Sequence, residues 1–167
     1  MKISIFWYRR DLRLEDNKGL FEALNENENV LPIFIFDDSI LDELPKNDAR
    51  VNFIYESLAK INKQLNKHNT SLQILKGQID DVWKNLVTTY DIQKVYLNKD
   101  YEPYAIKRDQ KIKEFLNSKG IEMKSFKDQV IFEEDEIVKA DGKPYTVFTP
   151  YKRKWLEKFI KVNLNSI

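Results

Sequence analysis

The chain alternates between short apolar runs and longer segments whose apolar residues recur every three or four positions. The runs predict buried β-strands at residues 3–8, 30–36, 72–75, 94–98 and 122–126. The run at 30–36 is almost continuously apolar, as expected for a strand covered on both faces. The segments between the runs, and one after the last, predict helices at residues 17–26, 48–68, 79–90, 103–119 and 150–162.

Some helix boundaries carry local signals. Asp16 is the predicted N-cap of the first helix, and Leu20, Phe21 and Leu24 share one face of it. Pro103 opens the fourth helix and Gly120 follows its end, the asymmetry that helix termini favour. Residues 142–149 predict a hairpin or an extended loop.

Alternation of strands and helices predicts parallel pairing through right-handed crossovers. The expected fold is α/β: a Rossmann-like, doubly wound, five-stranded parallel sheet with helices on both faces. Ligands in such folds bind at the carboxyl ends of the strands, where the strand order reverses. We expect that switch point at the first strand. No domain boundary is evident, so residues 1–167 are expected to form one domain.

Composition narrows the function classes. The 167 residues carry a net charge of only +1, which argues against a nucleic-acid binder that depends on a strongly basic face. There are no cysteines, so disulfides and thiolate metal sites are excluded. No apolar run approaches the roughly 20 residues that cross a membrane, and no signal-peptide pattern opens the chain. We expect a cytoplasmic protein with no membrane partner.

Several common catalytic motifs are absent. The four glycines cannot form a dinucleotide-binding or phosphate-binding glycine-rich loop, and no nucleophile elbow exists. The lone His68 ends a predicted helix, where a structural role is favoured. Asp37 and Asp38 follow the second strand and could be turn residues, metal ligands or ligand contacts. The acidic run at residues 133–136 is expected to be a solvated face.

The first strand runs into a dense charged segment. Residues 7–17 read Trp-Tyr-Arg-Arg-Asp-Leu-Arg-Leu-Glu-Asp-Asn, with three arginines and three acids within eight positions. Such density predicts interlocked ion pairs at a strand-to-helix turn, and we expect Asp11, Arg13 and Asp16 to form that network. Trp7 is expected in the core.

This opening segment resembles the signature of the DNA photolyase/cryptochrome family. Four further segments resemble that family in the same order, at residues 31–37, 50–54, 98–109 and 145–151. Together they cover nearly the whole chain. By this resemblance the chain is identified as the N-terminal α/β antenna domain of the family, most like the class I cyclobutane pyrimidine dimer photolyases.

The resemblance implies a function and partners. Family members bind a light-harvesting chromophore in this domain and pass its excitation to FAD, held with damaged DNA in a C-terminal helical domain that this chain lacks. The parent is then expected to be a deoxyribodipyrimidine photo-lyase. This chain alone is not expected to repair DNA, and an exposed domain interface could promote self-association.

The antenna site is expected at the carboxyl ends of the first, second and fourth strands, with the long helix alongside. The candidate chromophore-binding residues are Tyr8, Arg9, Arg10, Asp37, Asp38, Arg50, Phe53, Asn98, Asp100 and Tyr104. Arg9 or Arg10 could hold an anionic tail or form a surface ion pair. Phe53 and Tyr104 could stack on the dye or pack in the core. Arg108 is expected to pair with Asp109 or neighbouring acids.

One departure from the family bears on the chromophore. Folate-binding bacterial photolyases carry an Asn-Glu pair where this chain reads Tyr104-Ala105. The carboxylate that would grip the pterin is absent. This favours 8-hydroxy-5-deazaflavin or FMN over methenyltetrahydrofolate, or an empty pocket.

The last segment and the function class leave alternatives open. Residues 151–155 mix aromatic and basic side chains, which suits nucleic acid, but an amphipathic helix burying Trp155, Leu156, Phe159 and Ile160 is favoured. The parent could instead be a cryptochrome photoreceptor. A stand-alone nucleotide-binding protein of the universal-stress-protein type is a third reading.

Overall fold

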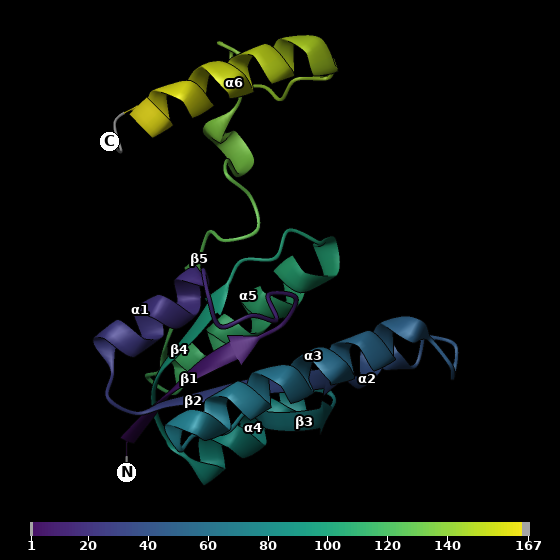
Figure 1. The fold of residues 1–167 in the computed structure, drawn as a ribbon, viewed down its shortest axis with the longest axis vertical. Helices are drawn as coiled ribbons and strands as arrows, with labels where there is room; N and C mark the ends of the chain where they lie inside the picture. The colour runs from purple at the N-terminus through teal and green to yellow at the C-terminus, as the bar shows by residue number, and fades with distance from the viewer. Residues whose placement is uncertain (1, 165–167) are drawn as a thin grey trace. The chain divides into compact units, whose positions relative to one another are not determined.

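The computed structural model describes residues 2–164 of the chain (Figure 1). Contacts within the chain divide it into two compact units, Met1–Gln129 and Val130–Ile167. No signal in the sequence predicted this division. Within residues 2–164, no helix is both long enough and apolar enough to cross a membrane.

The first unit contains a five-stranded sheet in which every neighbouring pair is parallel. Its strands are β1 (Lys2–Tyr8), β2 (Val30–Asp37), β3 (Gln73–Gly77), β4 (Asp91–Asn98) and β5 (Glu122–Phe126). The order is β3-β2-β1-β4-β5, so the chain reverses its direction of progress across the sheet at β1. The predicted parallel sheet and its switch point are confirmed.

Helices cover both faces of this sheet. They are α1 (Lys18–Glu26), α3 (Ala49–Leu65), α4 (Ile79–Thr89) and α5 (Pro103–Ser118). Side chains of α4 and α5 pack with alternate β1 residues in one core cluster, where Trp7 meets Trp83 edge to face at 5.2 Å. Side chains of α1 and α3 pack on the opposite face with Phe6 and Tyr8. The predicted burial of Trp7 is confirmed.

The first helix differs from its prediction in two respects. Asn17 is the N-cap, and its side-chain oxygen accepts from the main-chain N–H of Leu20. Asp16 instead adopts a left-handed conformation with φ of 50°. Only Leu20 of the predicted apolar face is buried, because Phe21 and Leu24 point to the surface.

The segment between β2 and β3 contains elements that the apolar pattern missed. A one-turn helix, α2 (Asp38–Leu41), follows β2 directly. Asp48 is the N-cap of α3 rather than part of it. The predicted long helix ends at Leu65 and continues as a 3₁₀ turn, η1 (Asn66–His68), whose His68 is exposed.

The second unit contains a 3₁₀ turn, η2 (Glu134–Glu136), and the helix α6 (Phe148–Leu164). Glu133 and Glu136 form a reciprocal capping box, so the acidic run is a structured turn. Trp155 packs on Phe132 and Phe159. Leu156 and Ile160, which were predicted to be buried, are 41% and 55% exposed.

Candidate functional site

The charged segment after β1 folds around one buried carboxylate. Asp11 accepts hydrogen bonds from the main-chain N–H of Arg9 at 3.1 Å and from the side-chain amides of Asn17 and Asn98 at 3.2 and 2.6 Å. Asn98 in turn accepts from the main-chain N–H of Gly19 at 2.8 Å. A carboxylate that is buried away from water is stable only when hydrogen-bond donors satisfy its oxygens. These bonds join the end of β4 to the start of α1, so Asn98 is a structural residue inside the fold rather than a group facing a ligand.

The prediction that Asp11, Arg13 and Asp16 form one ion-pair network is wrong, because Arg13 pairs with Asp128 instead. Arg13 donates to both carboxylate oxygens of Asp128 at 2.8 Å, and to the main-chain carbonyl of Asp16 at 2.6 Å. Asp128 also accepts from the main-chain N–H of Lys18 at 3.1 Å. A carboxylate at the start of a helix is favoured by the helix dipole. Asp128 therefore holds the charged segment and α1 together.

The two arginines after β1 point in different directions. The side chain of Arg9 is only 6% exposed, pairs with Asp109 on α5 and lies 5.5 Å from the ring centre of Trp7. Burial lowers the pKa of Arg9, and Asp109 opposes that change. Arg108 lies over Trp7 at 5.0 Å and pairs with Asp109 as expected. Arg10 is exposed and approaches Asp100 and Glu102, each at 3.4 Å.

An open cleft of about 470 Å³ lies between the loop after β1 and the first turns of α3. Its lining residues are Arg9, Arg10, Leu12, Ala49, Arg50, Phe53 and Ile54. Phe53 is 69% exposed, which excludes core packing as its role. Arg50 donates to Asp48 at 2.9 and 2.7 Å through Nε and Nη2, which orients its guanidinium. The cleft thus offers an accessible aromatic face beside oriented cations.

A second cluster of candidates lies at the carboxyl end of β2. Asp37 is buried, caps α2 by accepting from the main-chain N–H of Ser39 at 3.0 Å, and accepts from the hydroxyl of Tyr104. Burial and the Asp37 carboxylate raise the pKa of Tyr104. Asp38 pairs with Lys76 at 3.8 Å. Among residues 2–164 there is no group of three potential metal ligands. The cap that Asp37 forms on α2 fits the turn-residue alternative, and contact of Asp37 or Asp38 with a chromophore stays a prediction.

The predicted site residues therefore do not all lie in one place in the structure. Arg9, Arg10, Arg50 and Phe53 line the cleft. Tyr8 is fully buried against the α1 and α3 side of the core, and burial raises its pKa. Its side chain is a core group, which corrects its placement among the chromophore contacts.

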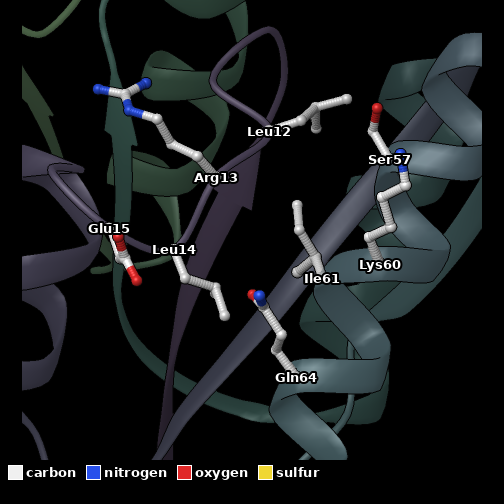
Figure 2. A pocket seen from close by; sticks show the side chains of 8 residues that line it. All are labelled: Leu12, Arg13, Leu14, Glu15, Ser57, Lys60, Ile61 and Gln64. Atoms are coloured by element: carbon white, nitrogen blue, oxygen red, sulfur yellow. The ribbon is translucent and has the colours of Figure 1, made fainter.

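A neighbouring pocket of about 310 Å³ was not predicted (Figure 2). It is lined by Leu12, Arg13, Leu14, Glu15, Ser57, Lys60, Ile61 and Gln64. Figure 2 shows Leu12 and Leu14 across from the α3 side chains, with Arg13 directed away. Positions 57, 60, 61 and 64 share the helical spacing of positions 50, 53 and 54. This helical spacing was the only signal in the sequence that these α3 residues would share one face of the helix.

Comparison with known proteins identifies the family. The family model described as DNA photolyase matches residues 4–165. The chain belongs to the DNA photolyase family. It is 31% identical over 151 residues to the deoxyribodipyrimidine photo-lyase of Synechococcus sp. (strain ATCC 27144), covering 90% of this chain and 31% of that protein. It is 32% identical over 162 residues to cryptochrome-2 of Arabidopsis thaliana, covering 96% of this chain and 26% of that protein.

Solved structures agree with the fold. The archaeal photolyase of Sulfolobus tokodaii, solved with two FAD molecules, is 34% identical with a TM-score of 0.69, over 81% of this chain and 32% of that one. A bacterial class III photolyase of Agrobacterium tumefaciens is 29% identical with a TM-score of 0.79, over 89% of this chain and 30% of that one. The chain corresponds to the N-terminal α/β domain of these photolyases and spans about a third of their length.

Proposed function

We propose that this chain is the light-harvesting domain of a photolyase and that the cleft between the β1 loop and α3 holds its chromophore. The observation that supports this most is the exposed Phe53 beside Arg10 and Arg50 in an open cleft at the switch point of the sheet. Planar dyes stack on aromatic rings, and anionic tails bind guanidinium groups. Ligands of open α/β sheets bind at this position.

The sequence after β4 favours a flavin-type dye over a folate. Tyr104 and Ala105 stand where folate-binding relatives carry an amide and a carboxylate, and Ala105 is buried. The Sulfolobus tokodaii structure contains two FAD molecules and is described as implying a novel light-harvesting cofactor. The favoured chromophores are therefore 8-hydroxy-5-deazaflavin and FMN rather than methenyltetrahydrofolate.

The wider activity is part of the same proposal. In a longer protein the excited dye would pass energy to FAD in a helical domain, and that FAD would drive repair of pyrimidine dimers in DNA. The class I assignment is also proposed, since the similar proteins include a class III photolyase and a cryptochrome. Nothing in the comparisons favours the stand-alone nucleotide-binding alternative.

A thermal-shift and calorimetric titration of the purified chain tests the chromophore role. The ligands are FMN, 8-hydroxy-5-deazaflavin and methenyltetrahydrofolate, with ATP as the control. A ligand at 100 times its Kd stabilises the folded state by about 2.7 kcal/mol. We expect saturable stabilisation by a flavin-type dye, lost in Phe53→Ala.

The matched control is Tyr55→Ala, because Tyr55 is 64% exposed on the same helix but does not line the cleft. Equal loss of binding in both variants would place the dye elsewhere. Stabilisation by the folate alone would contradict the flavin preference, and a response to ATP alone would revive the nucleotide-binding alternative.

A further inference from the structure

One face of the helix α6 is covered by aromatic contacts within the second unit. The ring of Trp155 lies 5.4 Å from that of Phe132 and 5.0 Å from that of Phe159, measured between ring centres. One turn earlier, Tyr151 lies 6.2 Å from Tyr145. These rings are the apolar contacts that α6 makes with its own unit, so its aliphatic side chains are left to another face.

That other face carries two basic and two aliphatic side chains in a row, which we call the α6 stripe. Lys152, Leu156 and Ile160 follow one another every four positions, and Arg153 precedes Leu156 by three. Side chains at these spacings lie on one side of a helix. All four are exposed. At 1.5 Å rise per residue, the stripe is about 12 Å long.

The cations of the α6 stripe differ from other cations of the helix. Lys154 and Lys161 both pair with Glu157, at 3.3 and 3.0 Å. Lys152 and Arg153 form no ion pair with any acid among residues 2–164. The stripe therefore combines two positive charges that the described part of the chain does not neutralise with two aliphatic side chains that it does not cover.

The composition of the stripe selects among possible partners. Nucleic acid needs rings on which its bases stack, and Tyr151 and Trp155 are engaged on the covered face. A membrane surface needs a wide apolar face, and two aliphatic side chains do not provide one. A second copy of this stripe would bring two more cations and no carboxylate. The complementary surface is one that carries acids beside aliphatic side chains.

We propose that the α6 stripe docks an acidic amphipathic helix of another protein. A ridge of side chains spaced by four positions packs into the groove between such ridges on a second helix. Aliphatic side chains of the partner cover Leu156 and Ile160, and its carboxylates pair with Lys152 and Arg153. The stripe belongs to the second unit and the chromophore cleft to the first, so this inference does not depend on the antenna function.

Fluorescence anisotropy of a labelled synthetic helix, added to the full chain, tests the inference. The peptide carries leucines every three or four positions with glutamates beside them. We expect saturable binding with a Kd on the order of 100 μM, typical of a small transient contact, and weaker binding at high salt. Lys152→Glu and Arg153→Glu are each expected to weaken binding about tenfold, because each places like charges opposite one another. The matched control is Lys154→Glu, outside the stripe, which should stay within about twofold.

A further variant tests the aliphatic part of the stripe without changing its charge. Ile160→Ala truncates an exposed side chain and should weaken peptide binding about fivefold. Equal effects of Arg153→Glu and Lys154→Glu, unchanged binding in Ile160→Ala, or equal binding of a peptide with lysines in place of its glutamates would each overturn the proposal.

The other occupants are tested with the same variants. Tighter binding of a single-stranded oligonucleotide or of phosphatidylglycerol vesicles, lost in Arg153→Glu, would assign the stripe to nucleic acid or to lipid instead. A dimer in analytical ultracentrifugation that Ile160→Ala abolishes would assign it to a second copy of this chain. We expect none of these three.

Discussion

Gly19 allows α1 to approach β4 more closely than any other residue could. A Cβ atom there would lie 2.6 Å from Oδ1 of Asn98, 3.0 Å from the Phe6 ring and 3.2 Å from the main-chain carbon of Leu97. The Phe6 ring and the main chain of Leu97 are rigid. Asn98 is held in place by the hydrogen bond that it donates to the buried carboxylate of Asp11. We expect Gly19→Ala to lower the free energy of unfolding by about 1–3 kcal/mol, measured by urea denaturation. This outweighs the helix propensity that favours Ala over Gly by about 1 kcal/mol.

The control for this prediction is Asn25→Ala, an exposed position near the end of the same helix. There propensity acts without a clash, so stability should stay equal or rise slightly. A Gly19→Ala protein as stable as this control would show that α1 can move away from β4 at little cost.

At the scale of elements, Glu26 joins the end of α1 to β4 and β5 through hydrogen bonds. It accepts hydrogen bonds from Lys124 on β5 and from Tyr96 and Lys94 on β4, which lower its pKa from 4.5 to about 2. Because the pKa is lower in the folded state, this stabilisation is present above the unfolded value and is lost as pH falls through the folded value. We expect the free energy of unfolding to decrease between pH 5 and pH 2, and to decrease less steeply in Glu26→Gln. The control is Glu28→Gln, at an exposed position in the following loop, and it should keep the pH dependence of the unaltered chain. An equal dependence of unfolding free energy on pH in all three proteins would contradict this role of Glu26.

At the scale of the whole molecule, the first unit contains everything needed for its own core. All members of both sheet-covering clusters lie between Ile3 and Phe126. The cleft between the β1 loop and α3 lies within the same unit. We expect a fragment of residues 1–129 to unfold in one cooperative urea transition by circular dichroism, and to bind a flavin-type dye as tightly as the full chain does. A broad transition without near-ultraviolet signal would show that residues after 129 are required for folding.

The strands, their parallel pairing and the family could be predicted from residue order because these properties depend on local patterns. The apolar run at residues 30–36 predicts a doubly covered strand, and β2 has that burial. The alternation of strand and helix restricts the connections to right-handed crossovers. Arg50 and Phe53 were correctly assigned to the long helix for the same reason, since helical spacing is visible over a few turns.

The remaining features depend on contacts between residues far apart in the chain. Asp16 and Asn17 are both competent caps, and Asn17 takes that position because Asp11 and Asn98 hold its side chain there. Arg13 meets Asp128 across 115 positions, a pairing that no local pattern contains. Phe21 satisfies the helical period but faces outward, because the helix rotation follows from how closely Gly19 packs on β4. The cleft exists for a related reason: its two walls, the loop after β1 and α3, come together only when the sheet and its helices have packed.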